Sequence, residues 1–402
     1  MLRLLSKSFI KDEIKKRILT LKKNLRKNNI DACIIIEKVD FFYYTGTTVE
    51  GLIYIEPEKK PLLLIRKPMG RAEFESPLSQ IDYFNSIKEI PQLISKYTSM
   101  RIKTMGLELD VLPFSLYNKI SGLFPNTKIV DISLLIKEQR AIKSQYELEN
   151  MKKAFKIIKK TLDYGKKLLK PGMTEIEFSA LLEGKSRSLG HQGIIRMRRF
   201  NQEASFGHIV FGTNNNIPCT MDSANGGLGP YPAIGQGAGF TKIRNNRPIM
   251  IDIIGGYNGY LIDITRVFVI GDLNQELKNA FFTTKKILEE IRKLLVPKMD
   301  CKKIYHKGII MAKEMGYLEK FMGPEKNHVE FLGHGVGLEL DEIPILSKDF
   351  SYSLKENNTL AIEPKIFIPN KGMVGIENTY VVTKKGGKSL TNYPETIIQI
   401  EA

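Results

Sequence analysis

Apolar and polar residues follow two different periods along the first third of the chain. Apolar positions recur at helical spacing from Ile14 to Asn28, with lysines between them, which predicts an amphipathic helix. A second helical pattern covers Glu89 to Tyr97. Short apolar runs bounded by turn residues, typical of strands, lie at Ala32 to Ile36, Leu52 to Ile55 and Leu62 to Ile65. The pattern indicates a small α/β domain that ends near Lys137.

Two capped helices begin the second part of the chain. Ser144 and Glu147 have the spacing of a capping box, and Thr174 and Glu177 repeat it after Pro171-Gly172. The apolar stripe of the first of these helices is Leu148, Met151, Phe155, Ile158 and Leu162. We therefore place the domains at residues 1–137 and 141–402.

Strand-like runs and glycine-rich loops dominate from Ile194 onward. We expect Asn201 to Gly239, which is rich in Gly, Asn and Pro, to be a long irregular segment. Loops of that length in a compact domain are usually functional.

Composition narrows the class of protein. The 402 residues are 42% hydrophobic and 26% charged, which excludes a disordered chain, and no apolar run is long enough to span a bilayer. The formal net charge is +17, but the lysines are spread over the chain as on solvated helix faces, so we expect no nucleic-acid and no membrane partner. Cys33, Cys219 and Cys301 show no CxxC spacing, which argues against disulfides and a thiolate zinc site. Without a signal peptide at its start, the chain is expected to be cytoplasmic.

An acidic hairpin carries the first candidate chemistry. Two apolar runs flank an Asn258-Gly259 turn signal, and Asp252 and Asp263 stand one on each run. Their odd separation places both side chains on one face of a hairpin with an even loop, where two carboxylates need a compensating cation. The alternative is that one aspartate faces solvent or pairs with Arg266.

Three further residues extend the set. His334 lies between glycines in Gly-His-Gly-Val-Gly, although a lone histidine in a turn is often structural. Glu363 and Glu377 interrupt two more strand-like runs; their separation puts them on one face only if the loop is odd or a bulge intervenes, and each alone could instead protect a strand edge. Four carboxylates and one imidazole suit a pair of divalent ions of the Mn, Co, Fe or Zn kind.

These five residues, with Asp263-Ile-Thr-Arg, Ile-Glu363-Pro and Gly-Ile-Glu377-Asn, resemble the metal ligands of the aminopeptidase P, prolidase and methionine aminopeptidase superfamily. Asp40-Phe-Phe-Tyr-Tyr-Thr-Gly and Arg140-Ala-Ile-Lys-Ser resemble its prolidase and creatinase branch. The resemblance implies an α+β protein in which a smaller creatinase-type α/β domain precedes a C-terminal pita-bread fold. It also implies a homodimer.

The resemblance also implies roles. Asp252, Asp263, His334, Glu363 and Glu377 would hold two divalent ions, Mn or Co in the first place and otherwise Zn or Fe, which acidify water and polarise the scissile carbonyl. Glu363 would also carry the proton from water to the leaving amine, as general base and then general acid. Thr265 would orient a ligand carboxylate, or else be merely structural.

Several positions depart from the branch's pattern. The two expected histidines are replaced by Asp341 and Cys219; His208 is a candidate substitute with a catalytic and substrate-binding role, or else a buried structural residue. Asp341 should favour a substrate ammonium group.

The positions that govern specificity differ as well. Glu-Pro-Gly has become Glu363-Pro-Lys365, and the arginine that commonly precedes Ile-Glu is Gly375, so strict dipeptide hydrolysis is in question. Arg198, with Arg196 and Arg199, could clamp a substrate carboxylate, or serve as an ordinary surface residue.

The resulting hypothesis is a dinuclear metallopeptidase that cleaves an N-terminal peptide bond of a small peptide, in the Xaa-Pro aminopeptidase or dipeptidase class. The alternatives are hydrolysis of a small non-peptide amide and a binding module that has lost catalysis.

Overall fold

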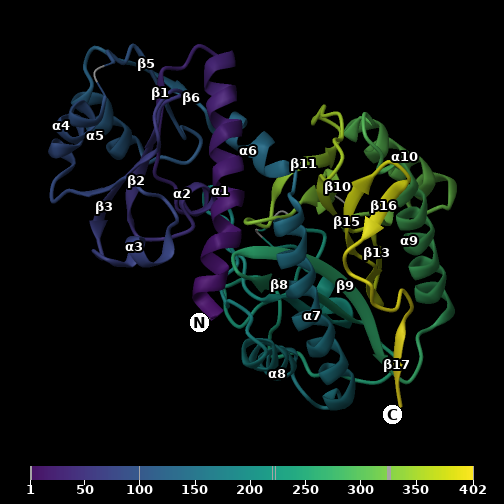
Figure 1. Cartoon of the computed structure of the whole chain (residues 1–402). Coiled ribbons are helices and arrows are strands. Elements are labelled where there is room, and N and C mark those ends of the chain that lie inside the picture. Colours follow the sequence, from purple (N-terminus) through teal and green to yellow (C-terminus); the bar gives the residue numbers. More distant parts are fainter. Residues whose placement is uncertain (1, 99, 220, 222, 324–326, 402) are drawn as a thin grey trace. The chain divides into compact units, whose positions relative to one another are not determined.

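The structure is a computed structural model that describes residues 2–98, 100–219, 221, 223–323 and 327–401. The chain divides into two compact units, residues 1–140 and 141–402, whose elements are labelled in Figure 1. No helix in these described ranges combines the length and apolar character that crossing a bilayer requires.

The N-terminal unit is built on a six-stranded sheet of order β4-β3-β2-β1-β5-β6, in which β1, β5 and β6 run parallel. The predicted apolar stripe of its first helix is buried, from Ile14 to Leu25. Its strands are β1 (Ala32–Ile35), β2 (Glu50–Ile55), β3 (Leu62–Lys67), β4 (Ile81–Tyr83), β5 (Thr104–Leu107) and β6 (Lys128–Asp131). Its helices are α1 (Leu2–Lys27), α2 (Lys38–Thr45), α3 (Arg71–Glu75), α4 (Ile90–Tyr97), α5 (Phe114–Leu123) and α6 (Ser133–Ala141), with the 3-10 turn η1 (Ile87–Glu89).

The two sequence motifs of this unit meet in a buried ion pair. Asp40 Oδ1, on α2, lies 2.6 Å from Arg140 Nη1, and both side chains are almost fully buried. A buried carboxylate requires such a partner, so this pair fixes α2 against the end of the unit.

The C-terminal unit contains three sheets. Their strand orders are β11-β10-β12-β15-β16, β13-β14 and β17-β9-β8-β7. The strands are β7 (Gly207–Phe211), β8 (Ile249–Tyr257), β9 (Tyr260–Ile270), β10 (Phe331–Gly335), β11 (Glu342–Ser347), β12 (Thr359–Ile362), β13 (Lys365–Ile368), β14 (Gly372–Gly375), β15 (Asn378–Thr383), β16 (Gly386–Ser389) and β17 (Ile398–Ile400).

Long helices pack on these sheets (Figure 1). The capping box predicted at Ser144 and Glu147 forms and starts the first of them, which packs on β8 and β9. The third packs on β13, β14 and β16, and a hydrophobic core of the unit lies between this helix and the strands. The helices are α7 (Gln145–Leu168), α8 (Glu175–Ser188), α9 (Gln275–Leu294) and α10 (Cys301–Glu314), with the 3-10 turns η2 (Gly212–Asn216) and η3 (Leu318–Lys320).

The hairpin of β8 and β9 sets the positions of the two aspartates. Asn258 and Gly259 have positive φ angles of 51° and 88°, the backbone that a two-residue turn of this hand requires. Asp252 lies opposite Thr265 and Asp263 lies opposite Ile254, which makes the aspartates diagonal neighbours. The predicted common face is therefore confirmed.

The strand pairs β12–β15 and β13–β14, which lie on either side of the two glutamates, share one pairing register. Ile362 lies opposite Asn378 in β12 and β15, and Lys365 lies opposite Gly375 in β13 and β14. At the break between these pairs, the same register sets Glu363 against Glu377. Because Ile368 pairs with Gly372, residues 369–371 form an odd loop, which is the condition under which both glutamates share a face.

The segment Asn201 to Gly239 is less irregular than predicted. It contains β7, which pairs with β8 and sets His208 directly opposite Asp252. The strand was missed because its short apolar run stands between glycines, which usually punctuate loops. The prediction of one continuous irregular segment was wrong there.

Candidate metal centre

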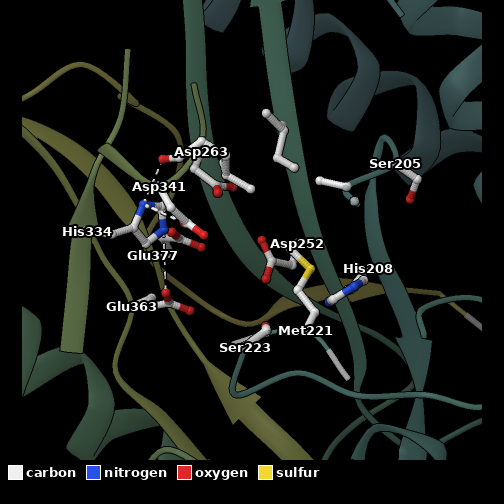
Figure 2. Close-up of a pocket in the computed structure, with 14 residues that line it drawn as sticks. Ser205, His208, Met221, Ser223, Asp252, Asp263, His334, Asp341, Glu363 and Glu377 are labelled. Atoms are coloured by element: carbon white, nitrogen blue, oxygen red, sulfur yellow. Dashed lines mark hydrogen bonds and ion pairs between the residues drawn. The ribbon is translucent and has the colours of Figure 1, made fainter. Parts of the chain in front are cut away.

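One pocket of the C-terminal unit gathers the charged side chains that the sequence singled out (Figure 2). It lies between β7, β8 and β9 on one side and β10 with the break between β12 and β13 on the other. Its polar lining includes Ser205, His208, Ser223, Asp252, Asp263, His334, Asp341, Glu363 and Glu377. The alternatives of an edge-protecting glutamate and an Asp–Arg266 pair are not realised, since Glu363 and Glu377 are buried and Arg266 donates mainly to backbone carbonyls.

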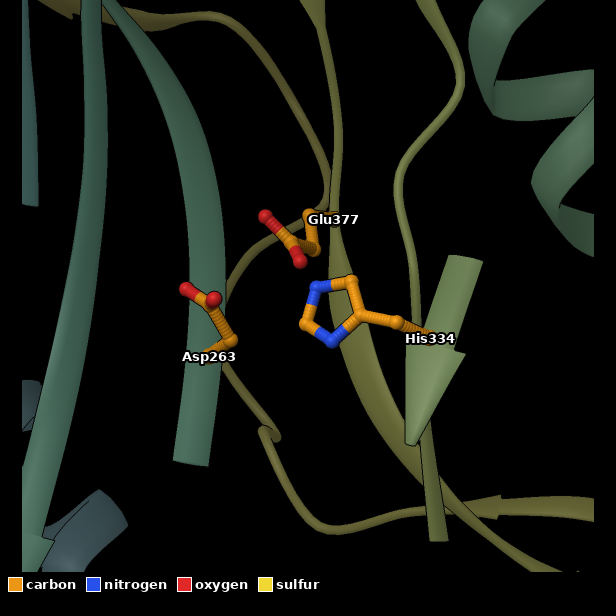
Figure 3. A group of neighbouring side chains, drawn as sticks. All are labelled: Asp263, His334 and Glu377. Atoms are coloured by element: carbon orange, nitrogen blue, oxygen red, sulfur yellow. The ribbon is translucent and has the colours of Figure 1, made fainter. Parts of the chain in front are cut away.

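Asp263, His334 and Glu377 point toward one another from three separate parts of the chain (Figure 3). Asp263 is on β9, His334 is on β10, and Glu377 immediately precedes β15. Each offers one ligand atom, and the three atoms lie within 4.8 Å of one another. Two carboxylates and an imidazole at this spacing form a donor set that suits a divalent ion.

Backbone carbonyls fix the orientation of the His334 ring. Nδ1 lies 3.0 Å from the carbonyl oxygens of Gly335 and Leu340, which only accept, so Nδ1 carries the proton and donates. In the neutral ring Nε2 then holds the lone pair, and it lies 3.6 Å from Glu363 Oε1. This arrangement is the one that metal-ligating histidines use.

The two oxygens of Glu377 differ in their surroundings. Oε2 accepts a hydrogen bond of 2.7 Å from Thr265 Oγ1. Oε1 is buried and has no hydrogen-bond partner among the described residues. A buried acceptor without a partner costs free energy, and a cation between Asp263, His334 and Glu377 would supply the partner.

A second group of three carboxylates, Asp252, Glu363 and Glu377, also brings its ligand atoms within 4.8 Å of one another. Here a side chain of the protein already supplies a cation. Lys365 Nζ lies 2.9 Å from Asp252 Oδ2, 2.5 Å from Glu363 Oε2 and 3.9 Å from Glu377 Oε2. The lysine side chain is completely buried.

The protonation of the carboxylates reflects this uneven distribution of positive charge. Burial, reinforced by the charges of Asp252 and Glu363, raises the pKa of Glu377 to about 8. Burial and the neighbouring carboxylates, Glu377 first, raise the pKa of Asp263 well above its usual range. Burial alone would also raise the pKa of Asp252, but the ammonium of Lys365, together with His208 and Thr265, outweighs burial and the pKa is lowered. Asp263 and Glu377 therefore bind protons more readily than free carboxyl groups do, and a metal ion at these residues would displace those protons.

The two groups fit a divalent ion differently. The group of Asp263, His334 and Glu377 fits one by donor type, by the fixed His334 ring and by the bare Glu377 oxygen. The group of Asp252, Glu363 and Glu377 has the right donors, but the ammonium of Lys365 already contacts one oxygen of Asp252 and one of Glu363. The residues present thus fit one ion and disagree with a second.

His208 and Asp341 both line the pocket, on opposite sides of the carboxylates (Figure 2). Burial, together with the nearby Lys365, lowers the pKa of His208 against the opposing effect of Asp252, so the ring is neutral at pH 7. Asp341 Oδ1 lies 3.5 Å from His334 Nδ1, and about a fifth of the Asp341 side chain is exposed. Both side chains can therefore meet a ligand in the pocket.

Arg198 and Cys219 take other positions. Arg198 does not line the pocket; its Nη1 lies 3.9 Å from Glu339 Oε2, and both side chains are mostly buried. Its role in substrate binding stays a prediction. Cys219 Sγ donates to the carbonyl oxygen of Asn225 at 3.3 Å.

The sequence analysis did not identify Asn225, and it related Lys365 to specificity and not to the carboxylates. Lys365 stands two positions after Glu363, and residues two apart in an extended segment share a face, which is the signal that could have found it. Asn225 donates its side-chain amide to Asp252 Oδ2 from the long segment before β8. Nothing local in the sequence distinguishes Asn225 from its neighbouring asparagines.

Comparison with known families covers both units. Residues 149–384 match the model of metallopeptidase family M24, and residues 17–142 match the creatinase/prolidase N-terminal domain.

Individual proteins match over nearly the whole chain. The chain is 26% identical to an Xaa-Pro dipeptidase of Pyrococcus furiosus over 382 residues, which cover 94% of this chain and 98% of that one. An X-Pro aminopeptidase structure from Thermotoga maritima superposes with a TM-score of 0.79 at 25% identity, over 94% of this chain and 98% of that one. A prolidase structure from Pyrococcus horikoshii gives a TM-score of 0.79 at 26% identity, over 95% and 100%.

Proposed function

The chain belongs to metallopeptidase family M24, and on that premise we propose that it cleaves the N-terminal peptide bond of Xaa-Pro peptides, as an aminopeptidase or a dipeptidase. It is a metal-dependent peptidase of the prolidase-like branch. The predicted fold, a creatinase-type N-terminal domain followed in the chain by a pita-bread domain, is confirmed. A binding module or a hydrolase of small non-peptide amides is not favoured by these relatives.

The observation that carries the proposal is the convergence of Asp263, His334 and the unpartnered Glu377 oxygen at the wall of a pocket. A divalent ion bound by these residues would acidify water and polarise a substrate carbonyl. Oxygen and imidazole donors accept several ions, and we propose Mn or Co, with Zn or Fe as substitutes.

Glu363 is placed to move the proton of the reaction. Its Oε1 faces His334 at 3.6 Å, on the side of the first group, while its Oε2 is held by Lys365. A carboxylate fixed in this way can take a proton from water and return it to the leaving amine. Glu363 therefore serves as general base and then general acid in the proposed reaction.

The remaining side chains of the pocket would bind the peptide. The neutral ring of His208 can donate a hydrogen bond to a substrate carbonyl or to the oxyanion that develops from it. Asp341 would pair with the free ammonium of the N-terminal residue. We propose that these two residues act in place of the histidines that the branch usually carries.

Two aspects of the protein's context stay predictions. The cytoplasmic location agrees with three cysteines that form no disulfide. A homodimer follows from the family resemblance alone, and size-exclusion chromatography with light scattering would test it.

The proposed activity is tested on the full chain after removal of metal and reloading with Mn²⁺ or Co²⁺. We expect release of the N-terminal residue from Xaa-Pro dipeptides or longer Xaa-Pro peptides, and loss of that release with a chelator. Matched Xaa-Ala peptides show whether proline is required. A protein that binds metal and cleaves none of these peptides would contradict the proposal.

A further inference from the structure

The ammonium of Lys365 lies among the oxygens that a second metal ion would need. We propose that Lys365 takes the place of that ion, so that the protein holds a single divalent ion, at Asp263, His334 and Glu377. The inference deepens the proposed function and rests on it only in that the first group binds metal. It sets this chain apart from the two-ion centre that its ligand residues imply.

The contacts of the ammonium disfavour a second ion. Lys365 Nζ lies 2.9 Å from Asp252 Oδ2 and 2.5 Å from Glu363 Oε2, so it uses one oxygen of each. A divalent ion bound to these two oxygens, at about 2.0–2.2 Å from each, would have to share them with the ammonium. The two cations therefore compete for the same oxygens and repel one another.

The backbone directs the lysine to this position. Lys365 and Glu363 are two residues apart in an extended segment and share a face. Across the strand pair, Gly375 leaves room for the lysine stem: a Cβ at Gly375 would lie 2.5 Å from Lys365 Cγ. The glycine is thus part of the arrangement that seats the ammonium.

The surroundings of the stem hold the lysine there. Lys365 is completely buried and does not line the pocket, and its neighbours Ile366 and Ile362 belong to the core. An ammonium withdrawn from Asp252 and Glu363 without a new partner would be a buried, unpaired charge, which is strongly unfavourable. The two ion pairs therefore hold the lysine in place.

The charge of the site favours one ion as well. Once metal binding has displaced their protons, the four carboxylates Asp252, Asp263, Glu363 and Glu377 carry four negative charges, and the ammonium with one dication supplies three positive ones. The remaining negative charge, beside Asp341, suits a peptide with a free ammonium group. Two dications beside the ammonium would exceed the charge of the four carboxylates by one and, with Asp341 included, would leave no net negative charge to attract that substrate.

The test counts ions in the full chain. Wild type, Lys365→Gly and Lys371→Ala are stripped with a chelator, reloaded with excess Mn²⁺ and freed of unbound ion. Lys365→Gly restores the glycine of the branch's pattern; Lys371 lies in the turn of the same hairpin and pairs with Glu276, so its variant is a matched loss of a lysine. Elemental analysis gives ions per chain, and electron paramagnetic resonance distinguishes isolated Mn²⁺ from a spin-coupled pair.

We expect a single ion and the spectrum of isolated Mn²⁺ in wild type and in Lys371→Ala, and a second ion with a coupled spectrum in Lys365→Gly. A coupled pair in wild type would overturn the inference, and so would a folded Lys365→Gly protein that keeps a single ion. The wild-type spectrum decides the matter even if Lys365→Gly does not fold. If the ion counts are as expected but neither protein cleaves an Xaa-Pro peptide, the proposed function fails and this inference stands.

Discussion

Lys365 and Gly375 are direct partners across β13 and β14, and the lysine stem occupies the space that a side chain at Gly375 would need. The branch that the sequence resembles has glycine at the first of these positions and commonly arginine at the second. The lysine at position 365 and the glycine at position 375 look like independent changes in the sequence. Because the two residues pair across the strands, each change accommodates the other. Together the two changes move a cationic side chain from one strand to the other and turn it toward the carboxylates.

This partnership predicts a coupled effect on stability. Gly375→Ala should lower the free energy of unfolding by about 1–3 kcal/mol, because its Cβ would crowd Lys365 Cγ at 2.5 Å and Pro364 O at 2.9 Å. In a Lys365→Gly background the cost should be smaller, since only the contact with Pro364 is left. Urea unfolding of the four proteins of this cycle, all metal-free, measures the coupling. Additive effects would contradict the packing described.

Replacing Glu363 by glutamine should remove the proton carrier. We expect kcat to fall by about 10²–10⁴-fold on an Xaa-Pro peptide, because an amide neither accepts nor returns the proton. The Asp263–His334–Glu377 group does not include Glu363, so the metal content should be unchanged. An active Glu363→Gln enzyme with full metal content would exclude Glu363 from the proton transfer.

The hydroxyl of Thr265 should support metal binding through Glu377. Thr265→Val keeps the shape but loses the 2.7 Å hydrogen bond to Glu377 Oε2, and we expect about 10–100-fold weaker binding of Mn²⁺ or Co²⁺. Thr265→Ser keeps the hydroxyl and is the matched control. Titration calorimetry gives both dissociation constants, and equal values for the two variants would mean that the hydroxyl does not position the carboxylate.

The acidity of the metal-free site should couple metal binding to pH. Burial and neighbouring carboxylates raise the pKa of Glu377 to about 8, so the folded apo-protein binds a proton there that the unfolded chain releases above its ordinary pKa of 4.5. This contribution to stability is full below the unfolded pKa and is lost as the pH rises through about 8. Apo-protein should therefore lose stability between about pH 5 and pH 9, while metal affinity rises over the same range as the competing proton leaves.

Thermal unfolding of apo- and metal-loaded protein across this range checks the sign. The difference in Tm between the two forms should widen as the pH rises. Calorimetry in buffers of different ionisation enthalpy should show proton release on metal binding. A metal-induced shift in Tm that does not change with pH would contradict the raised pKa.

Asp341 should determine the preference for a free N-terminus. Asp341→Asn should raise KM for peptides with a free ammonium group and leave KM for N-acetylated peptides unchanged. The difference in KM between the two kinds of peptide should therefore become smaller. The loss of one partly exposed ion pair corresponds to a change of about tenfold at most. Metal content serves as the control, because Asp341 also lies 3.5 Å from His334 Nδ1. Unchanged discrimination would remove Asp341 from substrate recognition.

The sequence predicted those parts of the site that depend on local pattern. Strand alternation and the Asn258-Gly259 turn placed Asp252 and Asp263 on one face, because the period of two and the turn type together set the register. That His334 and the two glutamates would meet this hairpin rested on the family resemblance, since contacts between distant strands leave no local signal.

Other contacts could not be anticipated. The pairing of Arg198 with Glu339 depends on how far-apart segments pack, and β7 was hidden between glycines. In the sequence, Lys365 stands where the branch usually has glycine, and this difference alone indicates only a change of specificity. Its position two residues after Glu363 pointed to the carboxylates, but the space opposite Gly375 became visible only in the structure.

A positive charge that is covalently part of the chain cannot be diluted away or stripped by a chelator. Its occupancy is set by folding and not by the supply of free ions in the surroundings. The activity of such a protein, plotted against the concentration of added metal, should follow a one-site saturation curve. It should lack the sigmoidal rise of a centre that must bind two ions. One buried lysine would thus reduce the number of metal ions that each chain needs from two to one.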